Sequence, residues 1–413
     1  MKPHHPTVLL ALILSIALPA SARPRPELAA SPPMGWNSWN WFGKKSINEQ
    51  VVRETVDAMV SSGLRDAGYT FVVVDGGWRD TQLAPDGGLR SHPERFPGGM
   101  KALADYAHSR GLKFGLHTVP GTHDCGGDPV GGLGHEEVQM KQFVDWGLDF
   151  LKIDRCRNKA SGRSEDNGWT EDVVKAVYTK WSGLIEHCGR DMVFSISAYR
   201  FRDWYPQTCH MARTTYDIEA RVTGGAVFDD GLTDNRSGKF HSVMNVVELN
   251  NAVAAHAGHG YWNDPDMLVT GEQGLSPDEQ QTHFALWCIM SAPLMIGSDP
   301  RHMIDAERNL LLNREAIAID QDSTEQGRRI RQTNGTEVWL KHLKHGRLAV
   351  LLVNRDAKET RQISFTRTDG GPKGTWIVRD VFSNKDLKIS DGRISLSTPP
   401  HGSHLLIVSR GSK

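Results

Sequence analysis

The stretch DFLKIDRC (residues 149–156) reads as a short, buried β-strand that ends in charged residues. Seven other short apolar runs share this pattern, most of them ending in polar or glycine-rich residues. They are PMGWNSW (33–39), YTFVVVDGGW (69–78), LKFGLHTVPG (112–121), MVFSISAY (192–199), ARTTYDIE (212–219), GHGYWNDPDML (258–268) and PLMIGSDP (293–300). The chain therefore contains eight candidate strands.

Stretches with helical periodicity separate most of these runs. Residues 48–68, NEQVVRETVDAMVSSGLRDAG, space their apolar side chains as a helix does and reach a stop signal at Gly63. Buried runs that alternate with helices indicate a parallel sheet, and eight such units predict a (β/α)8 TIM barrel. The interval between the fifth and sixth runs is short for a full helix, so an open doubly wound sheet is the alternative.

The sequence pattern changes after NREAIAIDQD (313–322). Apolar and polar residues then alternate in six segments divided by Gly, Asn, Asp and Pro: EVWLKHL, RLAVLLVN, RQISFT, TWIVRDVF, GRISLS and SHLLIVS. These segments predict a C-terminal antiparallel β-sandwich. We expect a signal peptide at 1–22, a linker at 23–30, the catalytic barrel at 31–325 and the sandwich at 326–413.

The N-terminus predicts export. MKPHHPTVLLALILSIALPASARP has a basic start, an apolar run from Thr7 to Leu18 and the sequence ASA just before Arg23, as in a cleavable secretory signal. A membrane anchor is the alternative, but it needs about 20 apolar residues. We therefore expect a secreted or periplasmic protein without a membrane span once the signal is removed. The net charge of −1 favours neither nucleic acid nor an anionic membrane as a partner.

Charged residues gather on one face of the predicted strand ends, because successive strand residues point in opposite directions. Phe150, Lys152 and Asp154 share a face that must point into the barrel, since helices cover the outside. The same parity groups Phe71 and Val73 with Asp75, Arg213 and Thr215 with Asp217, and Trp262 with Asp264 and Asp266. Five carboxylates and two cations are thus predicted to meet at one barrel mouth.

Buried charges are costly unless they are paired or used. A structural explanation exists for each charge taken alone: an ion pair between Lys152 and Asp75, an ion pair between Arg213 and Asp217, or an Asx turn before Asp266. The whole set favours an active site. Two carboxylates near cations and tryptophans suit glycoside hydrolysis, in which one acid protonates the leaving oxygen and a carboxylate attacks the anomeric carbon or activates water. Aromatic faces that suit a sugar ring are offered by Trp36, Trp39 and Trp78. For Trp36 and Trp39, simple packing is the alternative.

Several motifs closely resemble glycoside hydrolase family 27, the melibiase family of α-galactosidases and α-N-acetylgalactosaminidases. They are PPMGWNSW, FLKIDRC, RTTYD and YWNDPDMLVTGEQGLS, followed by ALWCIMSAPLMIGSDPR and AIAIDQD. The resemblance extends from about Ser31 to Asp322 and continues more loosely through the sandwich. It implies a retaining exo-glycosidase that hydrolyses terminal α-galactosides by double displacement through a covalent glycosyl-enzyme.

The same resemblance implies roles for individual residues. Asp154, in the K-x-D motif, matches the nucleophile, and Asp217, in R-x-x-x-D, matches the acid/base. Sugar-binding positions fall on Trp39, Asp75, Lys152, Arg213 and Asp266, and a disulfide beside the nucleophile strand falls on Cys125 and Cys156. The resemblance implies no metal and no cofactor, and an oligosaccharide or polysaccharide as substrate. Pairing among Cys188, Cys209 and Cys288 is left open.

Three positions depart from the galactosidase pattern. Gly76 replaces a second aspartate, His117 replaces a usual aromatic residue on the third strand, and Ser197 replaces a glutamate near the 2-position of the sugar. We place His117 and Ser197 among the substrate-binding residues. These departures keep related sugars open: α-N-acetylgalactosaminides, β-L-arabinopyranosides and α-1,6-glucans.

Two other classes of protein remain as alternatives. A non-catalytic carbohydrate-binding barrel would keep its aromatic residues but would have no need for both Asp154 and Asp217. A metal-dependent hydrolase would also gather acids, and HTVPGTHDC (117–125) contains possible ligands. This stretch lacks metal-ligand spacing, so a hydrogen-bonding loop is favoured.

Overall fold

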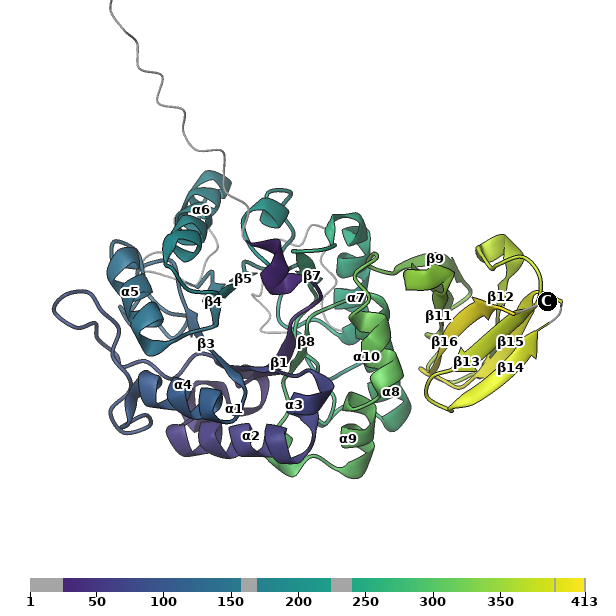
Figure 1. Cartoon of the computed structure of the whole chain (residues 1–413), viewed down its shortest axis with the longest axis horizontal. Helices are drawn as coiled ribbons and strands as arrows, with labels where there is room; N and C mark the ends of the chain where they lie inside the picture. The colour runs from purple at the N-terminus through teal and green to yellow at the C-terminus, as the bar shows by residue number, and fades with distance from the viewer. Residues whose placement is uncertain (1–24, 157–168, 224–239, 390, 412–413) are drawn as a thin grey trace, which may run out of the picture.

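The computed structural model describes residues 25–156, 169–223, 240–389 and 391–411 of the 413-residue chain. They form a barrel domain and, beside it, a smaller all-β domain at the C-terminus (Figure 1). The predicted signal peptide at 1–22 lies outside the described residues. Within them, no helix is both long and apolar enough to cross a membrane.

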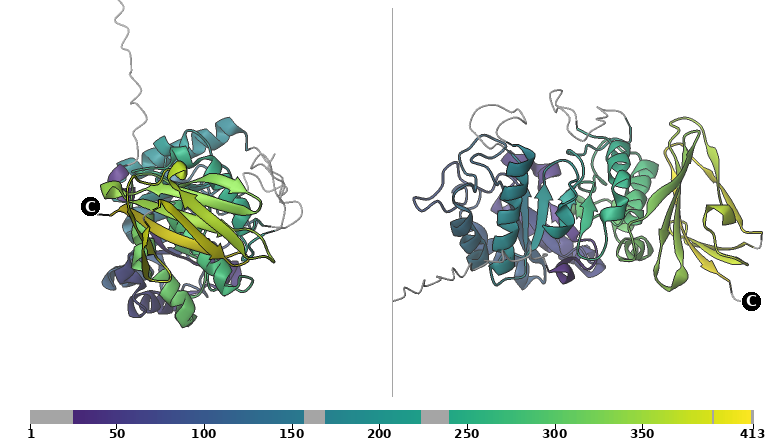
Figure 2. Two further views of the ribbon diagram at one scale, coloured as in Figure 1. Left: turned by 90° about the vertical axis from the view of Figure 1, so that its right-hand side faces the viewer. Right: turned by 90° about the horizontal axis from the view of Figure 1, so that it is seen from above.

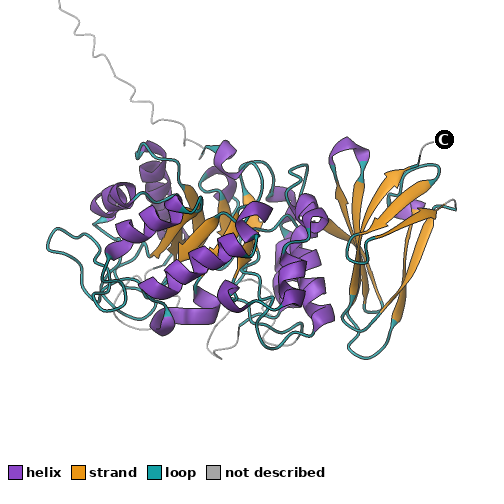
Figure 3. Cartoon of the chain, turned by 60° about the horizontal axis from the view of Figure 1, so that its bottom comes forward, coloured by secondary structure: helices purple, strands orange, loops and turns teal. Residues whose placement is uncertain are grey.

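The first domain is the predicted barrel: a parallel sheet at the centre with helices around it (Figure 3). Its eight strands pair in the order β7-β6-β5-β4-β3-β2-β1-β8. The ring closes just beyond β7, where Leu268 N donates to Met295 O at 2.7 Å and Gly297 N donates to Leu268 O at 2.8 Å. The strands are β1 (Met34–Asn37), β2 (Phe71–Val74), β3 (Lys113–Thr118), β4 (Phe150–Asp154), β5 (Val193–Ser197), β6 (Met211–Arg213), β7 (Trp262–Asp264) and β8 (Leu294–Ile296).

Helices cover the outside of the barrel, as the periodicity predicts. In the region of the helical pattern at 48–68, Asn48 accepts from Val51 N and caps the first turn, while Gly63 has the positive φ of 90° expected after a helix end. Between β5 and β6 there is only the turn η2 (Tyr205–Gln207), which fits the short interval. The helices are α1 (Trp39–Ser46), α2 (Glu49–Ser61), α3 (Leu64–Ala67), α4 (Gly99–Ser109), α5 (Glu136–Trp146), α6 (Glu171–His187), α7 (Val243–Ala252), α8 (Pro277–Ile289), α9 (Asp305–Leu311) and α10 (Arg314–Asp320).

The predicted strand parity is confirmed inside the barrel. A separate apolar cluster fills the interior: Phe71, Val73, Phe150, Val193, Met211, Met267 and Met295. The opposite faces of the same strands, such as Val72 and Leu151, belong to the larger core under the helices. The polar residues at the carboxyl ends of the strands therefore lie above an apolar floor.

The segment before the first strand closes the other end of the barrel. Residues Pro26–Ala29 form a 3₁₀ turn, η1, and Leu28 packs against the interior cluster. The Trp262 indole donates to Ala29 O at 2.8 Å. A small cavity here, between this segment, α6 and β5, is lined in part by Leu28, Ile185 and His210 and lies at the end opposite the acidic residues.

The C-terminal domain is the predicted antiparallel sandwich. A six-stranded sheet, ordered β14-β13-β16-β11-β10-β9, faces the two-stranded sheet β12-β15. All six predicted segments form strands; β9 and β14, at the two edges, are additional. The strands are β9 (Arg328–Thr333), β10 (Thr336–His342), β11 (Leu348–Asn354), β12 (Arg361–Thr366), β13 (Trp376–Asp380), β14 (Lys385–Ile389), β15 (Arg393–Thr398) and β16 (Ser403–Arg410).

The centre of the six-stranded sheet is buried on both faces. Along β11, Val350 and Leu352 point into the sandwich core, while Ala349, Leu351 and Val353 belong to the core shared with the barrel. Helix α8 supplies the barrel side of this contact (Figure 2), and its residues from Thr282 to Ile289 are all buried. The two domains therefore share one continuous apolar junction.

Candidate active site

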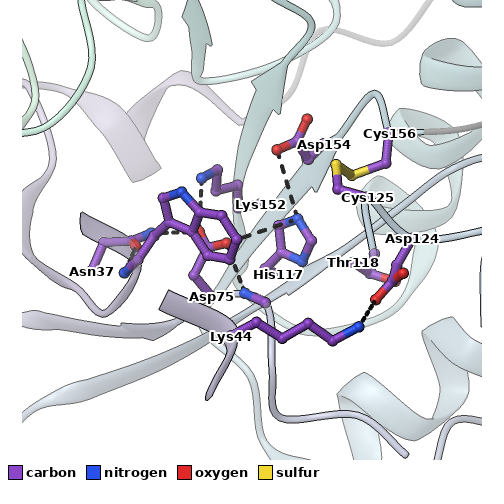
Figure 4. A network of polar contacts seen from close by, with 12 residues as sticks. Asn37, Lys44, Asp75, His117, Thr118, Asp124, Cys125, Lys152, Asp154 and Cys156 are labelled. Atoms are coloured by element: carbon purple, nitrogen blue, oxygen red, sulfur yellow. Dashed lines mark hydrogen bonds and ion pairs between the residues drawn. A yellow bond between two sulfur atoms is a disulfide. The ribbon is translucent and has the colours of Figure 1, made fainter. Parts of the chain in front are cut away.

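An ion pair joins the ends of β2 and β4. Lys152 Nζ lies 2.7 Å from Asp75 Oδ2, and Asn37 Nδ2 donates to the same oxygen at 3.0 Å (Figure 4). Burial opposes ionisation of Asp75, but the Lys152 ammonium holds the pKa of its carboxyl well below the usual range. The predicted pairing is present, and it fixes Lys152 at the centre of the mouth.

Asp154 ends β4 and receives a hydrogen bond on one carboxylate oxygen, while the imidazole of His117 lies near the other. Tyr199 Oη donates to Oδ1 at 2.6 Å, and His117 Nε2 lies 3.7 Å from Oδ2. Burial works against the charged form, yet the contact with His117, the charge of Lys152 and the Tyr199 hydroxyl together lower the pKa of Asp154. The carboxyl is therefore held as an ionised nucleophile would be.

A second ionic cluster lies at the ends of β6 and β7. One nitrogen of Arg213, Nη2, lies 3.0 Å from Asp266 Oδ2 and 3.2 Å from Asp217 Oδ1. Burial raises the pKa of Asp266, and the nearby Asp217 and Asp264 raise it further against the effect of Arg213. The Asx turn is also present, because Asp266 N donates to Asp264 Oδ1 at 2.8 Å. Asp217 thus shares its cation with a buried acid.

Exposure separates the five acids into two groups. The side chains of Asp154 and Asp217 remain 14% and 33% exposed, whereas Asp75 and Asp266 are buried at 4% and 3%. Asp264 is also buried. The structural pairings and the active-site prediction are therefore compatible, since the buried acids hold the cations and two carboxyls stay open to a substrate.

The three tryptophans also differ in exposure. Trp36 and Trp78 are completely buried, and their indoles donate to Ser298 O and His117 O, so for them the packing interpretation is correct. Trp39 stays half-buried at the mouth against the interior cluster. Its ring lies over Gly76: a Cβ on that glycine would come within 3.1 Å of Trp39 Cζ3. The aromatic face thus occupies the side of β2 where the resemblance leads one to expect a second aspartate.

Ser197 lies beside Asp154 but below the surface. It pairs with Asp154 across β4 and β5, it is completely buried, and its hydroxyl has no hydrogen-bond partner among the residues that the structure describes. Two residues later the chain turns through Tyr199, whose φ is 68°, and this ring reaches over to Asp154. Tyr199, rather than Ser197, presents the polar group at this point of the mouth.

The disulfide implied by the resemblance is present between Cys125 and Cys156. It ties the loop after β3 to the loop that follows β4 (Figure 4). The other three cysteines, Cys188, Cys209 and Cys288, are free thiols. Among the described residues, His117, Asp154 and Cys156 are close enough together to share a cation, but the sulfur of Cys156 is bonded in this disulfide and is no thiolate ligand.

Two residues that contribute to the site, Tyr199 and Arg79, were not predicted from the sequence. Tyr199 looks like an ordinary aromatic residue after a strand, and only its left-handed backbone directs it to Asp154. Arg79 follows Trp78 in the loop after β2 and contacts His117 from behind. Positive φ in a non-glycine residue is the signal that marks Tyr199, and it is visible only in three dimensions.

Comparisons with known proteins agree with this arrangement. Residues 31–322 match the family model described as Alpha galactosidase A, and residues 333–408 match the Alpha galactosidase C-terminal beta sandwich domain. The chain belongs to this family, glycoside hydrolase family 27. Its members are glycoside hydrolases, so this chain is an enzyme of that class.

Alignments with individual relatives cover most of this chain. It is 36% identical to an alpha-galactosidase of Cyamopsis tetragonoloba over 387 residues, 92% of this chain and 87% of that protein. It is 35% identical to Alpha-galactosidase A of Cellvibrio japonicus over 413 residues, 96% of each. The crystal structure of alpha-galactosidase I from Mortierella vinacea superposes with a TM-score of 0.85 at 28% identity, covering 94% of this chain and 99% of that one.

Proposed function

We propose that this protein is an exported, retaining exo-α-galactosidase. The observation that carries the proposal is the pair of accessible carboxylates, Asp154 and Asp217, set among buried ion pairs at the mouth of the barrel. Relatives that are 35% and 36% identical over more than nine-tenths of the chain are alpha-galactosidases, which supports the sugar. The substrate would be an oligosaccharide or polysaccharide with a terminal α-galactosyl group.

In the first step, an Asp154 carboxylate oxygen attacks the anomeric carbon and forms an ester bond. The glycosidic carbon–oxygen bond breaks, and Asp217 gives its proton to the leaving oxygen. The lowered pKa of Asp154 suits this role, because its carboxylate is ionised over the working pH range. Its Tyr199 contact orients one oxygen and leaves the carboxylate only partly covered.

In the second step, Asp217 acts as a base. It removes a proton from water while the water oxygen attacks the anomeric carbon, and the ester bond to Asp154 breaks. Asp154 regains its negative charge, which Lys152, the His117 ring and the Tyr199 hydroxyl stabilise. Two inversions at one carbon return the configuration of the substrate.

The first experiment is a panel of nitrophenyl glycosides, assayed with the wild type and with Asp154→Ala. The panel contains the α-galactoside, α-N-acetylgalactosaminide, β-L-arabinopyranoside and α-glucoside. We expect turnover of the α-galactoside, a loss of at least about 10⁴-fold in Asp154→Ala, and α-galactose as the first product by NMR. Preference for another sugar would contradict the specificity, and β-galactose as the first product would contradict retention.

A companion variant tests Asp217. Asp217→Ala should lose most activity on substrates with poor leaving groups and much less on a dinitrophenyl galactoside, which needs no protonation. A glycosidase that lost equal activity on both substrates would require another acid.

Export is tested by the mass of the mature protein. The N-terminal pattern supports cleavage after Ala22, so the secreted or periplasmic protein should begin at Arg23. Ala20→Arg should block this cleavage. Wild-type protein that keeps residues 1–22 and stays in the cytosol would contradict export.

A further inference from the structure

The imidazole of His117 is held between a cation and two carboxylates. His117 is buried on β3, with Arg79 Nη2 at 3.4 Å from its Nδ1. Its other nitrogen, Nε2, lies 3.7 Å from Asp154 Oδ2 and 3.9 Å from Asp75 Oδ1. Figure 4 shows the ring directed at both acids.

The chemistry of Arg79 decides where the proton of this ring lies. A guanidinium donates hydrogen bonds, accepts none and stays charged in proteins. His117 Nδ1 must therefore be the acceptor and carry no proton. A neutral imidazole has its single proton on the other nitrogen, which here is Nε2, the nitrogen that faces Asp154.

Arg79 is itself fixed in place. Its Nη1 donates to His117 O at 3.4 Å and to Thr118 Oγ1 at 3.3 Å, and its guanidinium is buried. The carboxylate of Asp124 attracts it electrostatically, and Lys44 in turn lies 3.1 Å from Asp124. Arg79 therefore cannot turn away to let Nδ1 take up a proton without breaking several contacts.

We propose that Arg79 is a positioning residue for the nucleophile: it holds His117 as the neutral Nε2–H tautomer, so that the ring donates toward Asp154 without carrying charge. This inference rests on the proposed role of Asp154. An imidazolium beside Asp154 would stabilise its negative charge and weaken its attack on carbon. The charged groups that face the ring are Asp75, Asp154 and, farther off, Lys152 on one side, and Arg79 on the other.

Without Arg79, protonation of the ring between two carboxylates is no longer opposed. An imidazole that is free to titrate is about nine-tenths protonated at pH 5.5. In Arg79→Gln we therefore expect kcat/KM for nitrophenyl α-galactoside to change little at pH 7.5 and to fall about tenfold or more at pH 5.5. The acid limb of the pH–rate profile moves to higher pH.

Three comparisons separate this role from a structural one. Arg202→Gln removes another buried arginine, one that contacts Glu171 and Tyr205 and not His117, and should leave the shape of the profile unchanged. His117→Gln should abolish the effect of Arg79→Gln when the two are combined. Arg79→Lys should restore part of the wild-type profile, because it keeps a donor and a charge.

Nitrogen-15 NMR of the histidine-labelled wild type tests the tautomer directly, with His117→Gln identifying the signals. We expect a protonated Nε2 and an unprotonated Nδ1. A proton on Nδ1, or an Arg79→Gln profile that matches the wild type, would overturn the proposal. Failure of the proposed function would give a different result, namely full activity in Asp154→Ala. If Arg79→Gln does not fold, the wild-type spectrum still decides.

Discussion

At the scale of the residue, the acids differ in exposure because they differ in what they contact. Asp75 and Asp266 are buried against Lys152 and Arg213, whereas Asp154 and Asp217 keep part of their surface. Tyr199 adds a hydrogen bond to Asp154 at the cost of a left-handed backbone, which is about 1–3 kcal/mol for a non-glycine residue. A strained residue that contacts Asp154, the proposed nucleophile, is a clear target for mutation.

Tyr199→Phe removes only the hydroxyl that donates to Asp154. Because that donor lowers the pKa of Asp154, its loss raises this pKa, and the acid limb of kcat/KM moves to higher pH. A hydrogen bond to a charged group contributes about 1.5–3 kcal/mol to the ionised form, so kcat/KM should fall about 10- to 100-fold at pH values on the acid limb, where less of Asp154 is ionised. The pH–rate profile checks this; an unchanged acid limb would show that the hydroxyl does not act on Asp154.

At the scale of the element, the site is built from strand ends that a barrel brings together and from loops that need separate support. The Cys125–Cys156 disulfide supplies that support beside Asp154. Lys44, on α1, reaches the same loop through Asp124 and Asp128 at 3.1 Å and 2.6 Å. Strand geometry sets the direction of the carboxylates, and these cross-links hold the loops around them.

Replacing both Cys125 and Cys156 by serine should destabilise the protein by about 3–4 kcal/mol, the loop-entropy value for residues 31 apart. Urea unfolding under non-reducing conditions measures this loss. Because Cys156 lies two residues beyond Asp154, kcat should also fall. The free thiol variant Cys188→Ser is the control; if it lost as much stability, the bridge would have no special contribution.

At the scale of the whole molecule, the sandwich completes the core of the barrel. Trp339 and Leu351 of the sandwich belong to the same apolar cluster as Phe284 and Trp287 of α8. Ion pairs span the junction as well, since Arg329 and Arg355 both contact Glu248 of α7 at 2.6 Å. An apolar junction of this kind couples the stability of the two domains.

The intact chain should therefore unfold in a single calorimetric transition. A chain that ends at residue 325 exposes the apolar face of α8 and should aggregate or unfold, while removal of residues 1–22 alone should have no such effect. Differential scanning calorimetry and gel filtration test both statements. Two well-separated transitions, or a soluble and folded barrel, would show that the domains are independent.

The sequence by itself determined the order of the elements and the identity of the acids. Eight apolar runs, most of them ending in polar residues, favour a barrel over an open doubly wound sheet, because a barrel buries each run under helices and brings the polar ends to one rim. The alternation of side chains along each strand then predicted correctly that Lys152, Asp154 and Asp75 point to the barrel mouth. The missed strands β9 and β14, RRIRQT and KDLKI, are charged because they form sheet edges, where charge prevents further pairing.

Only the tertiary structure decided which polar group does what. Three features depend on loops that fold back over the barrel. They are the burial of Trp36 and Trp78, the turn that directs Tyr199 to Asp154, and the contact between Arg79 and His117. Local pattern does not encode such contacts, because they join residues far apart in sequence. Protonation and exposure follow from those contacts, and so the chemistry of the site becomes defined only when the barrel closes.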